Sequence, residues 1–258
     1  MKIIIFGTGN YVTGRGTKEF GTILPALYEF NKISKVSELL IVATKKESEK
    51  QAQKKISELT KLSGQKIKVH FCNNKNLNFV LQKFKTSEKE IYCSIIATPD
   101  HTHFRIAENC LKHKYNCLIV KPAVTNSKDL QKLIKIANRN KLYAAVEFHK
   151  RFDRQAKLLK DKFDSNFIGL PLYTWTEYSQ KKIVPENFFK SWVSKNNVFQ
   201  YLGIHYVDLI RYITKGIPIS AMAIGQKGYL NKKKLFIEDS IQAIIKWKSA
   251  KGKVFSQT

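Results

Sequence analysis

Three apolar runs between residues 91 and 152 each stop abruptly at polar residues, and this arrangement narrows the folds open to the chain. The runs are Tyr92 to Ala97, Cys117 to Val120 and Leu142 to Val146, with predicted helices between them. Continuous apolar strands joined by helical crossovers are typical of a parallel sheet that is buried on both faces. Such sheets bind ligands at the carboxyl ends of their strands. The stretch therefore predicts a doubly wound α/β domain with its chemistry at those ends.

Glycines follow the first strand, which we expect at residues 2–6. Gly7 and Gly9 supply the tight turn and the close backbone approach that a pyrophosphate needs, and Thr8 and Asn10 belong to the same predicted binding turn. The third glycine of the dinucleotide-binding pattern would fall at Val12. We therefore expect a longer loop before the next long helix.

A second interpretation competes for the same residues. From Gly9 to Thr17 the chain approaches a P-loop, in which a lysine and then a serine or threonine follow the second glycine. Arg15 and Gly16 occupy those two places here. The later strand ends favour dinucleotide binding, and a Mg²⁺-dependent nucleotide enzyme remains the alternative.

The second strand, expected at residues 39–43, ends in Thr44, Lys45 and Lys46. Enzymes specific for NAD commonly place an acidic residue near this strand end to bind the ribose hydroxyls. A hydroxyl and two cations could instead hold a 2′-phosphate, which favours NADP over NAD as the cofactor. The alternative is that both lysines only begin a solvated helix.

Four short motifs carry a resemblance to a known family. They are A-T-P-x-x-x-H at residues 97–103, K-P at 121–122, R-F at 151–152 and G-x-H-x-x-D at 203–208. Together they resemble the Gfo/Idh/MocA oxidoreductase family over essentially the whole chain. The resemblance implies a Rossmann domain at residues 1–151 and a C-terminal α+β substrate and oligomerisation domain at residues 152–258. Family members continue beyond the position of Thr258, so this second domain looks shortened at its end.

The resemblance also implies a reaction. Family members are NAD(P)-dependent oxidoreductases that transfer a hydride between the cofactor and a ring carbon of a sugar, nucleotide sugar or cyclic polyol. In the family the lysine at the position of Lys121 bonds the reacting oxygen and touches the nicotinamide ribose, and the histidine at the position of His205 moves the hydroxyl proton. The turn after the fourth strand contacts the cofactor there. The corresponding residues are Ala97, Thr98, Pro99 and His103.

Lys121 also stands out from the residues alone. It ends an apolar strand and is followed by Pro122, whereas most lysines belong on solvated surfaces. Asp100 stands where the family usually has asparagine, although Thr98, Pro99 and Asp100 are also just a good turn and helix start. Val120 replaces a family glutamate. The loss of that neighbouring carboxylate makes a depressed lysine pKa easier to reach. We expect Lys121 to serve both catalysis and cofactor binding.

Glu147, His149 and Arg151 alternate along the chain, so we expect them on one face of a strand. His149 and Arg151 are candidates to line the substrate mouth. Arg151 could equally pair with Glu147 or Asp153, and the residues alone do not separate these roles.

A helix expected at residues 198–214 carries the other half of the predicted site. At about 3.6 residues per turn, Tyr201, His205, Asp208 and Tyr212 share one face, so Asp208 can orient the imidazole. Histidine suits proton transfer because its ordinary pKa lies near neutrality. Tyr201 stands where the family usually has aspartate. The phenol could donate to the substrate, or the chain could be a catalytically impaired dinucleotide-binding sensor or scaffold.

Charge limits the expected partners. The chain has 46 basic and 20 acidic residues and a net charge of +26, which attracts anions. Proteins that bind nucleic acid usually concentrate such charge in one stripe with interleaved aromatic residues, whereas here lysines are spread along predicted helix faces. We therefore expect no specific nucleic acid, and the family resemblance implies a small-molecule sugar or polyol substrate instead.

Cysteine content, the N-terminal residues and the last predicted strand indicate the compartment, the absence of a metal site and the assembly that we expect. The four cysteines are too few for a disulfide framework, so a reducing cytoplasm is expected. Cys110, His113 and Cys117 have metal-like spacing but would point apart, so no metal site is expected. The apolar run at residues 3–6 is too short for a signal peptide or a membrane span. The last predicted strand leaves an open sheet edge, through which we expect a homo-oligomer.

Overall fold

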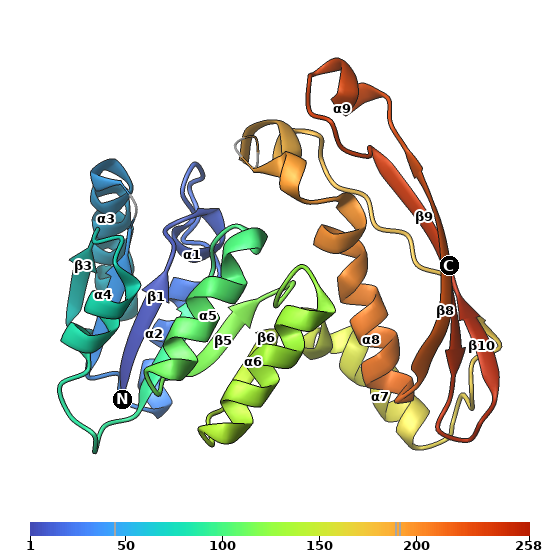
Figure 1. The fold of residues 1–258 in the computed structure, drawn as a ribbon, viewed down its shortest axis with the longest axis horizontal. Coiled ribbons are helices and arrows are strands. Elements are labelled where there is room, and N and C mark those ends of the chain that lie inside the picture. Colours follow the sequence, from blue (N-terminus) through green and yellow to red (C-terminus); the bar gives the residue numbers. More distant parts are fainter. Residues whose placement is uncertain (44, 189, 191) are drawn as a thin grey trace. The chain divides into compact units, whose positions relative to one another are not determined.

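Six parallel strands form the sheet of the N-terminal half, in the order β3-β2-β1-β4-β5-β6 (Figure 1). The computed structural model describes residues 1–43, 45–188, 190 and 192–258. Strand order reverses between β1 and β4, at the switch point where doubly wound sheets bind ligands. Phe6 pairs with both Val42 and Ile96, so the turns after β1 and β4 are neighbours. The strand bounds are β1 Lys2–Phe6, β2 Glu38–Val42, β3 Val69–Cys72, β4 Tyr92–Ile96, β5 Asn116–Val120 and β6 Ala144–Glu147.

Helices cover both faces of this sheet, because alternate residues of a strand point to opposite faces. Ile4 and Phe6 share a buried core with α4, α5 and α6, whereas Ile3 and Ile5 share one with α1, α2 and α3 (Figure 1). The doubly wound Rossmann fold predicted from the apolar runs is confirmed. The bounds are α1 Asn10–Thr13, α2 Ile23–Ile33, α3 Lys46–Ser63, α4 Leu77–Phe84, the 3-10 helix η1 Asp100–Thr102, α5 His103–Lys112 and α6 Ser127–Arg139.

The chain divides into two compact units, Met1–Glu147 and Phe148–Thr258, so the expected boundary at Arg151 lies a few residues into the second unit. That unit has a four-stranded sheet in the order β7-β10-β9-β8. Val207 and Ile210 of α8 pack on this sheet against Trp247, which is completely buried. The predicted α+β class of the second domain is confirmed. Its elements are η2 His149–Phe152, α7 Arg154–Asp164, β7 Tyr173–Thr174, η3 Val184–Phe188, η4 Val193–Lys195, η5 Phe199–Gly203, α8 Ile204–Thr214, β8 Ile217–Gln226, α9 Tyr229–Lys232, β9 Ser240–Lys248 and β10 Val254–Gln257.

The prediction that Glu147, His149 and Arg151 share one strand face is wrong. β6 ends at Glu147, and the 3-10 helix η2 follows it. The physical reason lies in the neighbouring strand, since Val120, the last residue of β5, is the partner of Glu147. Beyond that pair β6 has no strand to bond, and the chain turns. In the same unit β7 is short and pairs with β10 through Tyr173 and Thr174 alone.

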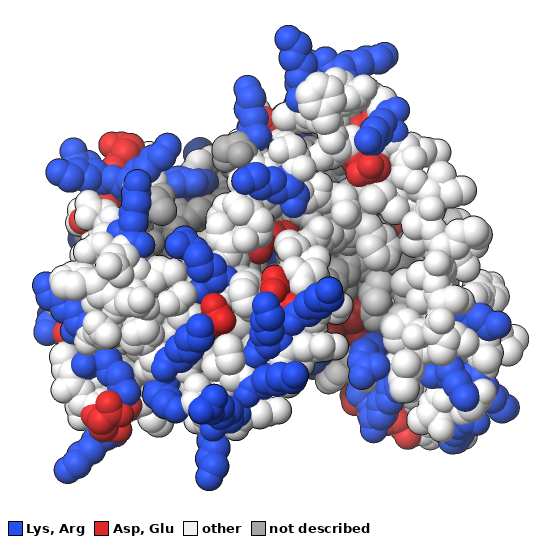
Figure 2. Space-filling view, in the orientation of Figure 1, with Lys and Arg blue, Asp and Glu red and all other residues white. Residues whose placement is uncertain are grey.

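Lysine and arginine side chains are scattered over the visible face of the molecule, with acidic residues between them (Figure 2). This pattern resembles a generally basic surface more than a single charged stripe. None of the described helices has the length and hydropathy that crossing a bilayer requires.

Candidate active site

The glycine turn after β1 lies directly against the turn after β4. Gly7 has a φ of +113°, and a Cβ at this position would lie 2.2 Å from the Ala97 carbonyl oxygen. Only glycine therefore fits this close approach. Gly9 precedes α1, and a Cβ there would meet no atom within 4 Å. Thr8 is buried, and its carbonyl oxygen accepts a hydrogen bond of 3.2 Å from the Thr13 hydroxyl.

The loop after this turn contributes a cation that the sequence patterns did not single out for the cofactor. The Arg15 guanidinium donates a 3.0 Å hydrogen bond to the Ser48 hydroxyl in the first turn of α3. Asn10, the first residue of α1, donates to the Arg15 carbonyl oxygen at 3.4 Å. Lys45 and Lys46 begin α3 and are exposed, so Arg15 reaches the same helix end as both lysines. Thr44 lies outside the described residues.

His103 joins the turns that follow β4 and β5. Its ring is completely buried, with Nδ1 2.8 Å from the Pro122 carbonyl oxygen and Nε2 2.7 Å from the Thr98 carbonyl oxygen. Burial lowers the pKa of this imidazole. The Thr98 hydroxyl bonds the Thr102 hydroxyl at 2.7 Å, while Ala97 and Pro99 are half-buried beside it in the turn. The His103 ring thus lies between the backbones of the two turns, and its N–H donates to one of these carbonyl oxygens.

Lys121 follows β5 directly and is half-buried, with a cis peptide bond to Pro122. Burial lowers the pKa of its amine to about 8, while the charges of Asp100 and then Glu147 act in the opposite direction. Asp100 is 5% exposed, and burial raises the pKa of its carboxyl to about 6, opposed by the charge of Lys121. A half-buried amine and two carboxylates thus come together at the carboxyl ends of β4, β5 and β6.

In the second unit, α8 and the η2 segment bring two imidazoles together. His205 is 5% exposed, and its ring centroid lies 4.6 Å from that of His149 in an edge-to-face arrangement. The Phe148 ring packs on His205 as well, at 6.3 Å. His149 was a candidate for the substrate mouth, and the structure places it beside the candidate acid/base.

Arg151 bonds Asp208, a pairing that their distance along the chain did not suggest. Arg151 Nε donates to Asp208 Oδ2 at 2.7 Å, and Nη2 donates to Oδ1. The guanidinium lies between two rings, 5.2 Å from the centroid of Phe148 and 5.1 Å from that of Tyr212. Asp153, one of the partners considered for Arg151, bonds Lys150 at 3.0 Å. The Arg151–Asp208 pair thus joins η2 to α8.

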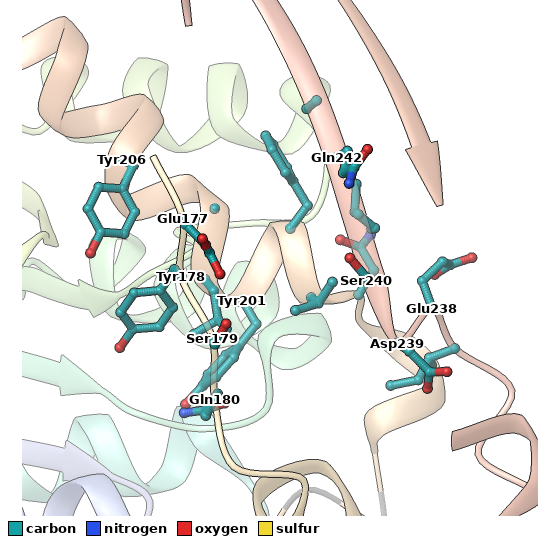
Figure 3. Close-up of a pocket in the computed structure, with 18 of the residues that line it drawn as sticks. Glu177, Tyr178, Ser179, Gln180, Tyr201, Tyr206, Glu238, Asp239, Ser240 and Gln242 are labelled. Carbon is teal, nitrogen blue, oxygen red and sulfur yellow. The ribbon is translucent and has the colours of Figure 1, made fainter. Parts of the chain in front are cut away.

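A cavity of about 910 Å³ lies within the second unit. Tyr201 and Tyr206 line it from η5 and α8, on either side of His205 in the sequence. A segment carrying Glu177, Tyr178, Ser179 and Gln180 faces the strand that carries Ser240 and Gln242 (Figure 3). The Tyr178 and Tyr206 rings contact each other, with their centroids 5.6 Å apart. Apart from Tyr201, sequence patterns missed this lining, since it combines an irregular segment at residues 175–180 with residues of α8 and β9 that are far away in the chain.

The cysteines and histidines with metal-like spacing lie in ordinary structural environments. Within the part of the chain that the structure describes, no group of three or more His, Cys, Asp or Glu side chains could hold a metal ion. The Cys110 and Cys117 side chains were expected to point apart, yet both are buried in the same core cluster, where the Ser94 hydroxyl donates to the Cys117 sulfur at 3.1 Å. His113 instead bonds the Asn109 carbonyl oxygen at 2.9 Å.

One comparison decides the family. The model of the Gfo/Idh/MocA family, described as "Oxidoreductase family, NAD-binding Rossmann fold", matches residues 1–148. The chain belongs to this family. The match covers more than half of the sequence and all of the parallel sheet described above.

Relatives of this family member differ in their substrates. The chain is 29% identical over 143 residues to the UDP-N-acetylglucosamine 3-dehydrogenase of Acidithiobacillus ferrooxidans, covering 55% of this chain and 42% of that one. It is 25% identical over 124 residues to the rhizopine catabolism protein MocA of Rhizobium meliloti, covering 48% of this chain and 38% of that one. These alignments thus span less than half of either relative.

Solved structures support the fold over the full length. An inositol dehydrogenase homolog from Azotobacter vinelandii, solved with NADH and myo-inositol, superposes with a TM-score of 0.71 at 12% identity. The superposition covers 100% of this chain and 63% of that one. At such low identity the likeness shows the fold of both units and no more.

Proposed function

We propose that the protein is an NAD(P)-dependent oxidoreductase that transfers a hydride between the cofactor and a ring carbon of a sugar, nucleotide sugar or cyclic polyol. The observation that carries this proposal is Lys121, a half-buried amine with its pKa lowered to about 8, at the carboxyl end of β5 in a dinucleotide-binding domain. Family membership and the named dehydrogenases among the relatives support it.

The residues of the first unit fit a dinucleotide. The open space around Gly9 leaves its backbone accessible, and Gly7 lets the chain pass Ala97 closely, as a pyrophosphate turn requires. We assign contacts with the cofactor to this turn and to the loops that His103 holds. When bound, the nicotinamide supplies the hydride acceptor or donor. The proposed binding residues are Gly7, Thr8, Gly9, Asn10, Thr44, Lys45, Lys46, Ala97, Thr98, Pro99, His103 and Lys121.

The chain's own side chains would move the proton and polarise the oxygen. We propose that the Lys121 ammonium donates a hydrogen bond to the reacting oxygen, where it stabilises developing negative charge. His205 would take the hydroxyl proton as general base in oxidation and return it in reduction. Tyr201, which lines the cavity of the second unit, would bond the substrate. His149, Arg151 and Asp208 stay predicted substrate-side residues of the same unit.

The experiment that tests this function is a reduction assay with purified protein. We expect NADP⁺ or NAD⁺ to be reduced in the presence of at least one member of a panel of inositols, free sugars and nucleotide sugars, followed through the absorbance of the reduced nicotinamide. Tight dinucleotide binding with no reduction across the whole panel would contradict the proposal and favour a binding protein without turnover.

We predict that NADPH binds more tightly than NADH by about tenfold, or about 1.4 kcal/mol. The reason is that Lys45, Lys46 and Arg15 gather at the end of β2 and can pair with a 2′-phosphate. Thermal-shift titrations of both cofactors measure the difference. Replacing Lys45 and Lys46 by alanine should remove the preference. The matched control replaces Lys50 and Lys54, exposed lysines further along the same helix. Equal binding of NADH and NADPH by the unmodified protein would contradict this account.

We also propose a homo-oligomer formed through the second sheet. The expectation that the last strand leaves the open edge is wrong, because β10 lies between β7 and β9, and β8 forms an edge instead. Every residue of β8 is exposed, including Met222 at 65% and Ile224 at 63%, and Ile244 of β9, the partner of Met222, adds to the same apolar surface. Replacing Met222 and Ile224 by glutamate should therefore reduce the molar mass seen by light scattering to that of a monomer. The control is Ile33→Glu, an isolated exposed residue at the end of α2. A monomeric unmodified protein at micromolar concentration would refute the proposal.

The four cysteines are free thiols, which supports the proposal of a reducing cytoplasmic compartment. The proposed partner is the sugar or polyol substrate of the reaction described above, and no nucleic-acid partner is proposed.

A further inference from the structure

We propose that Asp100 and Glu147 are positioning residues that hold Lys121 in its cationic form, with Asp100 the stronger of the two. This inference rests on the proposed function, because it assumes that the Lys121 ammonium polarises the reacting oxygen. It adds two side chains to which the sequence assigned no such role. Asp100 had been interpreted as part of a turn, and Glu147 as a possible partner of Arg151.

The placement of the three groups follows from the sheet. β4, β5 and β6 are adjacent and parallel, so their carboxyl ends lie along one edge. Ile96 at the end of β4 pairs with Ile119 of β5, and Val120 pairs with Glu147 at the end of β6. Lys121 directly follows Val120, and Asp100 begins η1 just after β4. The lysine thus leaves the middle strand while the carboxylates leave the strands on either side.

Burial strengthens the electrostatic interaction between these charged groups. Asp100 is 5% exposed, and such a carboxylate is costly to ionise unless a cation stabilises it. The Lys121 charge lowers the carboxyl pKa against the burial that raises it to about 6. In the same way Asp100, and then Glu147, raise the amine pKa against the burial that lowers it to about 8. Each group therefore favours the charged form of the other.

The pH window of the ion pair follows from these two pKa values. Between about pH 6 and about pH 8, Asp100 is ionised and Lys121 is protonated. Below this window Asp100 takes up a proton, and above it Lys121 loses one. The nearby His103 is buried, and that burial lowers the pKa of its imidazole, while His101 is exposed. Asp100 and Glu147 are thus the charges that keep the amine protonated at neutral pH.

The test measures the pKa of Lys121 in the cofactor-free protein. Lysine labelled with ¹³C at Cε is titrated by NMR, and the Lys121 resonance is assigned by its loss in Lys121→Arg. We expect Lys121 to titrate near pH 8, well below the lysines of the solvated surface. In Asp100→Asn the midpoint should fall by about one pH unit, a tenfold change in the ratio of charged to neutral amine. Glu147→Gln should lower it by a smaller amount.

The matched control is Asp164→Asn, which removes the exposed carboxylate of the Lys160–Asp164 pair on α7 and should leave Lys121 unchanged. A Lys121 midpoint that stays constant or rises in Asp100→Asn overturns the inference. Should that variant fold poorly, the reciprocal measurement decides: in Lys121→Met the Asp100 carboxyl must titrate above its midpoint in the unmodified protein. These measurements need no substrate. If the Lys121 midpoint falls as expected in Asp100→Asn but the reduction assay shows no turnover, the proposed function is contradicted and the electrostatic coupling of the three residues is not.

Discussion

Replacing Lys121 by methionine is expected to lower kcat/KM by about 100-fold or more. Methionine keeps much of the side-chain volume but removes the ammonium that would stabilise charge on the reacting oxygen, and such interactions carry effects of this size. Binding of NADPH should change much less, since the glycine turn and the β2 end remain intact. Steady-state kinetics with the best substrate of the reduction panel, together with a cofactor titration, provide both quantities.

The control for this change is Lys112→Met, which removes an exposed lysine paired with Glu108 on α5. It should leave kcat/KM unchanged within about twofold, because exposed pairs contribute little. A Lys121→Met protein with the kinetics of the control would refute the role assigned to the amine.

Replacing Arg151 by methionine is expected to destabilise the second unit by about 2 kcal/mol. The change leaves the Asp208 carboxylate, 8% exposed, without the guanidinium that bonds both of its oxygens. Breaking a fully buried pair costs about 3–5 kcal/mol, and the smaller figure reflects the 35% exposure of the Arg151 side chain. The loss should also loosen the packing of His149 against His205, since the pair ties η2 to α8.

Urea unfolding followed by tryptophan fluorescence measures this effect selectively. The chain has three tryptophans, and Trp175, Trp192 and Trp247 all belong to the second unit. The matched control is Lys150→Met, which breaks the more exposed pair with Asp153 in the same segment and should cost less than about 1 kcal/mol. Equal unfolding free energies for the two variants would show that the Arg151–Asp208 pair contributes no more than a surface contact.

The residues that sequence patterns predicted well are those whose environment is local. Apolar runs such as Ile3 to Phe6 and Cys117 to Val120 had to be strands buried on both faces, and the parallel sheet follows from them. Lys121 could be recognised because a lysine at the end of such a run has no structural reason to be there. The glycine turn could also be predicted from the sequence. The close approach of Gly7 to Ala97 leaves no room for a side chain, so the position requires glycine.

The predictions that were wrong or incomplete depended on partners far away in the chain. The expected strand through Arg151 stops at Glu147 because its neighbour β5 stops at Val120. Arg151 and Asp208 lie 57 residues apart, so no local spacing could reveal their hydrogen bonds. Asp100 looked like an ordinary helix start, and only the packing of the turns around it makes it a buried acid. Such environments are set by tertiary structure, which a single sequence shows only indirectly.

We propose that Lys121 and His205 serve one hydride-transfer reaction, and a single-turnover measurement tests this proposal most directly. The unmodified protein, Lys121→Met and His205→Asn are each saturated with NADP⁺ and mixed with the best polyol or sugar of the panel, and formation of NADPH is followed. The account predicts that all three bind the dinucleotide, while both variants form NADPH at least about 100-fold more slowly. Transfer at the unmodified rate by either variant would contradict it.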